Sequence, residues 1–335
     1  MILELNLIEV DRKNMLISNK IKKFVSSKKI LSKIEFEKKI SEGFRYEVSK
    51  NKLKHDIEQI SYLLKKKLIS KKFKKALKSY KIVYNALPKN SNPTDIFTLT
   101  KDFTNKLGPT FNNLIYYQPP DILEKKLISD NKKVVVKNSK KKFMYMIIDD
   151  FLNKEVLDIL HNYCLTNSIW SEFDYKNGYI GSFIENGFNA PLLLQISEEL
   201  RLHYPEILKK LPLTKAWAFK CNNLMKGIKI HADFAAINVN FWITPDKANL
   251  NKSTGGLLIW DKEAPKNWNF EKYNNNHLEI KKFLKKKKSK MRKIEYKSNR
   301  VIIFNSNLFH ASDNFNFKKN YESRRINMTL LYCKK

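Results

Sequence analysis

The apolar residues of this chain follow two different periods, one in its N-terminal part and one in its C-terminal part. Between residues 57 and 68, apolar side chains recur every three or four positions with lysines between them, as in an amphipathic helix. Residues 1 to about 90 share this character, so we expect an α-helical region there. Beyond Pro212, short apolar runs alternate with polar or glycine-containing segments, which predicts β-strands.

The predicted strands are short and separated by turn-rich or charged loops, a pattern typical of a jelly roll or cupin-like barrel. They cover residues 216–221, the segment around and after His231, and residues 255–260, 300–304 and 325–332. A strand and then a helix are predicted from Phe143, with Asp149 or Asp150 as the helix cap. A further helix is expected at 190–203. The predicted fold class is therefore α+β, with helices flanking a C-terminal barrel.

The same patterns divide the chain into segments. We expect a helical region at 1–90, a connector rich in Asn, Pro, Ser and Lys at 91–142, and the β domain at 143–335. A long polar segment at about 265–298 interrupts the strands, and we interpret it as an insertion over the barrel mouth. It is either part of a substrate lid or a passive surface loop, and the passive loop is the simpler interpretation.

One group of residues in the helical region matches a known repeat. Ala76, Tyr80, Val83 and Pro88 have the offsets found in the second helix of a tetratricopeptide repeat. No convincing second copy follows at the expected period. A single degenerate repeat and a generic helical hairpin are therefore equal alternatives. The helices at this position would either pack against the next domain or dock a protein partner.

The chain carries a net charge of +32, from 65 basic and 33 acidic residues. Such an excess is typical of proteins that bind nucleic acid or anionic membranes. Here lysine outnumbers arginine and is scattered along the chain, so we favour compositional drift over a polyanion site and do not expect a nucleic-acid partner. The run at 285–288 is interpreted as a solvated loop.

Cysteine usage and the N-terminus indicate the compartment. The three cysteines lie far apart and lack any C-x-x-C spacing, which argues against a disulfide framework or a zinc knuckle. Acidic residues occupy the N-terminal positions where a signal peptide would carry lysine, and no apolar stretch is long enough to span a membrane. We therefore expect a cytoplasmic protein without a membrane partner.

The candidate chemistry begins with His231 and Asp233, an H-x-D pair next to the predicted strands. Residues two apart in an extended strand project to the same face, so both side chains can reach one metal ion. A third ligand is expected from His310, which ends the apolar run that starts at Val301. Two histidines and one carboxylate with open positions form the ligand set of non-haem Fe(II) oxygenases. The rival third ligand, His277, is expected in a solvated loop.

A cation near such a site can bind a dicarboxylate cosubstrate. Arg325 is the candidate for the far carboxylate of 2-oxoglutarate, and Asn327 shares its strand face and can add a hydrogen bond. Arg324 points to the opposite face if the strand is regular. The simpler alternative for Arg325 is a surface ion pair with Glu322.

Taken in their order along the chain, these motifs resemble those of a known superfamily. Residues 231–246, 253–261, 299–310 and 324–332 resemble the 2-oxoglutarate and Fe(II)-dependent oxygenase superfamily, and within it a group of bacterial proteins with tetratricopeptide repeats ahead of the oxygenase domain. The resemblance implies a double-stranded β-helix core, with Fe(II) and 2-oxoglutarate as cofactor and cosubstrate, and ascorbate as a further candidate. It implies His231, Asp233 and His310 on iron and Arg325 on 2-oxoglutarate.

The reaction implied by the resemblance is hydroxylation of an unidentified substrate, with 2-oxoglutarate converted to succinate and CO₂. Two alternatives stay open on the sequence. One is a barrel without turnover that acts as a binding or scaffold protein, with the N-terminal helices docking partners. The other is a nucleic-acid demethylase in which the lysines follow the phosphate backbone.

Overall fold

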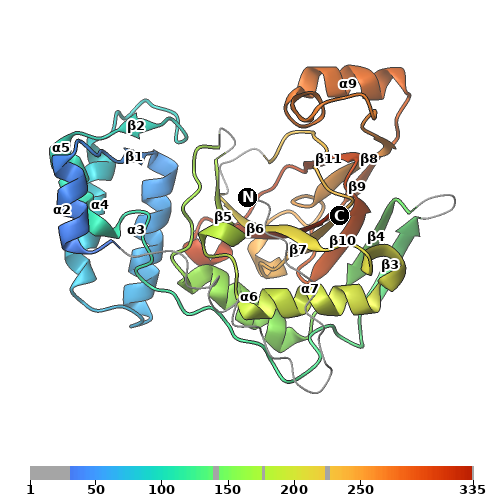
Figure 1. Ribbon diagram of the computed structural model, residues 1–335, viewed down its shortest axis with the longest axis horizontal. Helices are drawn as coiled ribbons and strands as arrows, with labels where there is room; N and C mark the ends of the chain where they lie inside the picture. The colour runs from blue at the N-terminus through green and yellow to red at the C-terminus, as the bar shows by residue number, and fades with distance from the viewer. Residues whose placement is uncertain (1–30, 139–142, 176–177, 223–226, 334–335) are drawn as a thin grey trace.

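The computed structural model describes residues 31–138, 143–175, 178–222 and 227–333. A helical unit formed by the first 80 or so of these residues lies beside two β-sheets and their flanking helices (Figure 1). The part of the expected helical region at 1–30 lies outside the described residues. Within the described ranges, no helix has both the length and the hydrophobicity required to cross a membrane.

The helical unit starts with capped helices and has a core of its own. Ser32 and Glu35 form a capping box at the start of α2, and the Ser49 side chain caps α3. Helices α3 and α4 form a hairpin in which Tyr80 and Val83 are buried. The resemblance to a tetratricopeptide repeat stays a prediction. The elements are α2 (Lys33–Ser41), β1 (Glu47–Val48), α3 (Lys50–Lys65), α4 (Phe73–Ala86), β2 (Phe97–Thr98) and α5 (Lys101–Leu107).

A seven-stranded antiparallel sheet is the framework of the rest of the chain, with strand order β3-β4-β10-β7-β12-β6-β5. Apart from β3 beside β4 and β5 beside β6, neighbours in this order are not consecutive in the chain, so the sheet joins segments from 133 to 332. The strands are β3 (Lys133–Asn138), β4 (Tyr145–Asp149), β5 (Tyr179–Phe183), β6 (Leu213–Cys221), β7 (Ile237–Trp242), β10 (Arg300–Asn305) and β12 (Arg325–Tyr332). The predicted strands at 216–221, 300–304 and 325–332 are confirmed.

A smaller sheet of order β11-β8-β9 packs on one face of the main sheet. Its strands are β8 (Leu257–Glu263), β9 (Met291–Ile294) and β11 (Leu308–Ser312). A shared apolar cluster contains Ile302 and Phe304 from the main sheet and Leu257 and Ile259 from the smaller one. We call the face of the main sheet that meets this cluster the inner face.

Helices cover the opposite face of the main sheet. α6 (Lys154–Thr166) and α7 (Pro191–His203) bury Leu160, Leu192 and Ile196 against that sheet (Figure 1). The helix predicted at 190–203 is therefore confirmed. The predicted cap of α6 is wrong, because Asn153 is the N-cap residue.

The two aspartates proposed as that cap have other partners. Asp149 ends β4 and binds Arg300 and Lys297, while Asp150 lies 3.5 Å from Lys297. Both carboxylates therefore pair with cations at, or just before, the start of β10. These ion pairs compete with a role as the N-cap of α6.

Two segments contain more regular structure than their polar composition predicts. The expected connector at 91–142 contributes α5 to the helical unit and β3 to the edge of the main sheet, so this sheet starts ahead of residue 143. The insertion at 265–298 contains a π-helical turn at Glu271–Asn275, then α9 (His277–Lys286) and β9. The lysine run expected in a loop begins within α9. Ile280 and Leu284 of α9 pack on the smaller sheet, and this burial stabilises the helix despite its polar sequence.

A buried ion pair joins the helical unit to the main sheet. Arg324, immediately before β12, donates from Nε and Nη2 to the Glu58 carboxylate of α3 at 2.9 and 2.8 Å. The Arg324 side chain is 4% exposed and that of Glu58 22% exposed. Removing one partner of such a pair leaves a buried charge without compensation.

We expect Glu58→Gln to lower the free energy of unfolding by about 2–4 kcal/mol, because the buried Arg324 charge loses its counter-ion. Chemical denaturation measures this. Asp158→Asn is the matched control, since Asp158 pairs with Lys154 at exposed positions of α6 and its loss should have no comparable effect. Equal stabilities of the two variants would contradict this role of the pair.

Candidate metal centre

Two histidines are brought together by their backbones. His231 lies ahead of β7 and His310 lies in β11, and they form an isolated antiparallel bridge. The His231 amide donates to the His310 carbonyl at 2.9 Å, and the His310 amide donates back at 2.8 Å. Directly opposite residues of an antiparallel pair project to one face. The two ring centroids are accordingly 4.3 Å apart.

This arrangement differs from the sequence expectation in two ways. His231 and Asp233 do not lie in a regular strand, because β7 begins only at Ile237. His310 does not end the apolar strand β10, but lies in the next strand, β11. The convergence predicted from strand alternation is instead produced by the bridge and by the loop that follows it.

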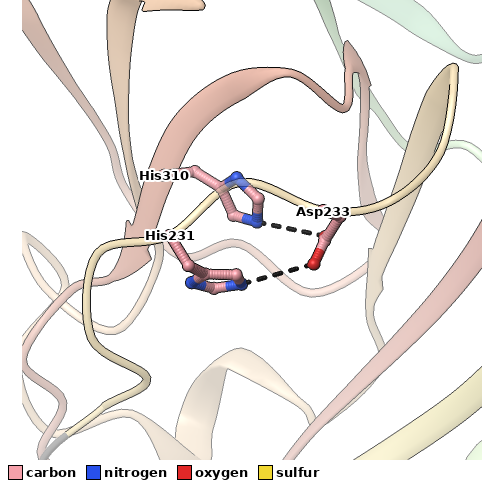
Figure 2. A group of neighbouring side chains, drawn as sticks. All are labelled: His231, Asp233 and His310. Carbon is pink, nitrogen blue, oxygen red and sulfur yellow. Dashed lines mark ion pairs between the residues drawn. The ribbon is translucent and has the colours of Figure 1, made fainter. Parts of the chain in front are cut away.

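Asp233 completes the cluster. Its carboxylate oxygens lie 3.5 Å from His231 Nε2 and 3.3 Å from His310 Nε2 (Figure 2). One ligand atom from each residue lies within 4.8 Å of the others. The Asp233 amide donates to the Ser306 carbonyl at 3.1 Å, which ties the loop to the turn between β10 and β11. The structure therefore brings together all three residues predicted as metal ligands.

The hydrogen bonds of the two Nδ1 atoms determine which ring nitrogen of each imidazole carries a proton. His231 Nδ1 lies 2.7 Å from the Lys229 carbonyl, and His310 Nδ1 lies 3.0 Å from the Leu308 carbonyl. A carbonyl oxygen can only accept, so each Nδ1 carries a proton and donates it. An imidazole that is neutral with its proton on Nδ1 has a lone pair on Nε2, and Nε2 is the atom that faces the Asp233 carboxylate in both rings. Three electron-pair donors that face one another form a site for a cation.

The charge states favour the same conclusion. Burial, and to a smaller extent the nearby His310 ring, lower the pKa of His231 to about 4, so His231 is neutral at pH 7. Burial alone would raise the pKa of Asp233, but the two imidazoles and the Asn238 amide lower it to about 2. An ionised carboxylate beside a neutral imidazole is the state that a divalent metal requires of its ligands.

Asn238 begins a chain of buried amides that leads away from the metal ligands. Its Nδ2 donates to Asp233 Oδ2 at 2.6 Å, and its Oδ1 accepts from Asn240. Asn240 Oδ1 in turn accepts from Asn327 Nδ2 at 3.0 Å and from the Thr329 hydroxyl at 3.3 Å. We call these four residues the polar lane. Sequence reasoning missed Asn238 and Asn240, although polar residues that alternate in an apolar strand were a signal for them.

Arg325 lies beyond Asn327 on the same strand and the same face. It is 4% exposed, and its Nε donates to the Gly255 carbonyl at 2.7 Å. Its guanidinium lies within 6 Å of the ring centroids of Trp242, Tyr296 and Phe315. In the described ranges no carboxylate forms an ion pair with it, so the alternative pair with Glu322 is not formed.

A buried cation without a counter-ion is a site for an anion, because removing charge from water is costly unless it is paired. The Trp242 indole N–H is also buried and has no hydrogen-bond partner. It lies on the strand next to β12, directly across from Asn327. Arg324, the weaker candidate, is committed to Glu58.

His277, the rival metal ligand, has a different place. It begins α9, is half-buried, and its Nδ1 lies 2.9 Å from the Ile230 carbonyl. The expectation that His277 lies in a solvated loop is therefore wrong. It also lies outside the cluster of His231, Asp233 and His310. The insertion nevertheless contacts Ala232, which lies between His231 and Asp233. The Ala232 amide donates to the Tyr273 carbonyl at 3.0 Å, and its carbonyl accepts from Asn274 Nδ2 at 2.9 Å.

No model of a protein family matches the chain, and no curated protein matches it either. Solved structures with a similar backbone include HygX from Streptomyces hygroscopicus, with nickel, 2-oxoglutarate and hygromycin B bound, at 9% identity and a TM-score of 0.40. A Pseudomonas putida prolyl-4-hydroxylase is similar at 11% identity and a TM-score of 0.38. The non-heme α-ketoglutarate-dependent epimerase SnoN from nogalamycin biosynthesis is similar at 9% identity and a TM-score of 0.42.

Each similarity covers 57% of this chain, and 83%, 92% and 78% of the respective structures. At these identities and TM-scores the similarity describes part of the backbone only. The chemistry of this chain therefore has to be argued from its own residues.

We expect Asn238→Leu to weaken divalent-metal binding by about 10- to 100-fold, because the Asp233 carboxylate loses the amide that orients it and lowers its pKa. Calorimetric titration with Mn(II) measures this. Asn240→Leu is the graded control, since Asn240 contacts Asn238 and should have a smaller effect. An unchanged dissociation constant in Asn238→Leu, or a larger effect of Asn240→Leu, would contradict the proposed orientation.

Proposed function

We propose that this protein is an Fe(II)- and 2-oxoglutarate-dependent oxygenase that hydroxylates its substrate. One observation carries the proposal: two imidazole Nε2 atoms and an ionised carboxylate converge on one point, and a chain of buried amides connects that carboxylate to the strand that carries an unpaired arginine. The first group fits a divalent metal, and the second fits an organic anion with carboxylates.

The ligand set alone does not choose the metal. Two histidines and a carboxylate bind non-haem iron, and a similar set with an open position also occurs in catalytic zinc sites. Arg325 supports iron with 2-oxoglutarate, because a hydrolytic zinc site has no need of a buried cation that lacks a counter-ion. His231, Asp233 and His310 would hold the metal.

The binding of 2-oxoglutarate would use the other end of the polar lane. Its far carboxylate would pair with the Arg325 guanidinium, whose planar fork matches a carboxylate. The free Trp242 N–H offers a neutral donor beside it. The Asn327 amide, the other donor proposed for the cosubstrate, already donates to Asn240 and Thr329, so it would have to release one of them to bind 2-oxoglutarate. The aromatic rings around Arg325 lower the local polarity, which strengthens the ion pair.

When bound, iron and 2-oxoglutarate supply the oxidising chemistry: O₂ is consumed, 2-oxoglutarate becomes succinate and CO₂, and one oxygen atom enters a C–H bond. The protein supplies orientation and the exclusion of water. Lys229 and Leu308 hold the two rings by their carbonyls, and Asn238 holds the carboxylate. Phe304 packs edge-on against His310 and keeps this side of the centre apolar. No separate acid or base is required.

We expect the unmodified protein to develop a weak visible charge-transfer band with anaerobic Fe(II) and 2-oxoglutarate, and His231→Ala to abolish it. Arg325→Met should retain metal binding but weaken 2-oxoglutarate binding by about 10- to 100-fold, because a charge-assisted bidentate contact is lost. Absorption titration measures both. His277→Ala is the matched control, because His277 lies outside the cluster and should leave the band unchanged.

Absence of the band, together with absence of metal-dependent succinate formation, would refute the enzyme proposal and favour a binding or scaffold protein. Steeply salt-dependent binding of DNA or RNA would instead favour a nucleic-acid demethylase that uses the same centre.

A further inference from the structure

The inner face of the main sheet continues past the polar lane into a group of aromatic side chains on β5 and β6. We call this group the aromatic strip; its members are Tyr175, Tyr179, Phe183, Trp217 and Phe219. Tyr179 stacks on Tyr175 with 4.2 Å between ring centroids and lies 4.4 Å from Phe219. Trp217 lies 6.0 Å from Phe219 and 5.8 Å from Phe183.

The strand register places this strip on the same face as the proposed cofactor residues. Phe219 is directly opposite Asn327, and Trp217 is directly opposite Thr329. Cross-strand neighbours of this kind project to the same side of a sheet. Since Asn327 and Thr329 belong to the polar lane, the strip extends the floor of the proposed site sideways, towards the edge strand β5.

The strip also lies within reach of the metal centre. Two strand spacings separate β6 from β7, the strand whose Asn238 holds Asp233, which corresponds to about 10 Å. A molecule that rests on the strip can therefore extend one end to the metal.

Gly181 makes room for the Phe219 ring in the middle of the strip. It faces Phe219 across the sheet, and a Cβ atom at Gly181 would lie only 3.0 and 3.2 Å from two ring carbons of Phe219. The absent side chain lets the Phe219 ring lie against the backbone. Tyr179, Phe183 and Trp217 remain half-buried, so their rings are partly available to a ligand.

The chemistry of the strip identifies its occupant. Trp217 and Phe183 are half-buried and present ring surfaces, which suit the face of a planar aromatic ring. The charges at its two ends differ. Lys215 is exposed at the end near Trp217, and no acid forms an ion pair with it in the described ranges. Asp174 lies near Tyr175 at the other end, and Glu172 pairs with Gly181 at the middle of β5.

We propose that the substrate carries a planar aromatic ring, which stacks on Trp217 beside Phe183, and an anionic substituent directed towards Lys215. This inference rests on the proposed function, because it takes the strip as the substrate side of the same metal centre. The net charge of +32 further disfavours a cationic ligand.

The test compares two probes in metal-free protein by calorimetry or saturation-transfer NMR. 2-Naphthoate has a planar ring, and decahydro-2-naphthoate has the same carboxylate on a saturated ring. We expect the unmodified protein to bind 2-naphthoate several-fold to about ten-fold more tightly, because only the planar ring stacks. Trp217→Leu and Phe183→Leu should each reduce this preference, and Lys215→Met should weaken both probes alike.

Two controls separate the strip from other sites. Trp260→Leu replaces a half-buried tryptophan of the smaller sheet and should leave the preference unchanged. Arg325→Met is the second variant, and it reports whether the carboxylate of the probe binds the proposed 2-oxoglutarate site instead of the strip. Equal affinities for the two probes, or a preference that depends on Arg325 and not on Trp217, would overturn the proposal.

The outcome is distinguishable from failure of the proposed function. A preference that depends on Trp217, in a protein that shows no Fe(II) and 2-oxoglutarate band, would support the aromatic site and refute the oxygenase. The band without any preference would support the oxygenase and refute this substrate class.

Discussion

The two hydrogen bonds between the backbones of His231 and His310 are the constraint on which the site depends. They join the loop ahead of β7 to the middle of β11, so two residues far apart in sequence become direct neighbours. Their rings then face the Asp233 carboxylate with protonated Nδ1 atoms turned outward. This geometry is fixed by the backbone, so the fold itself brings together the three residues that we propose as metal ligands.

The rest of the molecule supports this centre from three sides. The main sheet supplies the polar lane and Arg325, the smaller sheet carries His310, and the insertion binds Ala232 between the two ligands of the loop. Two adjacent arginines near β12 have different partners. Arg325 is buried without a counter-ion and donates to the Gly255 carbonyl, whereas Arg324 forms an ion pair with Glu58 of α3. The helical unit is thus attached one residue away from the proposed cosubstrate site. A role for it in docking a protein partner stays a prediction.

Local patterns predicted much of this structure, and non-local contacts explain what they missed. The strands at 216–221, 300–304 and 325–332 and the helix at 190–203 follow from apolar periodicity, which each segment carries in its own residues. β3 was missed because its short apolar run, with Val134 and Val135 exposed, lies in a polar segment, and α9 because four of its ten residues are lysines; only packing on β4 and on the smaller sheet reveals them. The three ligands were predicted by residue type and order, but the bridge that joins two of them depends on pairing that no local pattern records.

The most direct test of this account is a crystal structure of the protein with Mn(II) and 2-oxoglutarate, with the metal located by its anomalous scattering. The account predicts one metal ion bound by His231 Nε2, His310 Nε2 and an Asp233 oxygen, with 2-oxoglutarate on the metal and its far carboxylate on Arg325. A metal ion held by other residues, or 2-oxoglutarate bound away from Arg325, would contradict it.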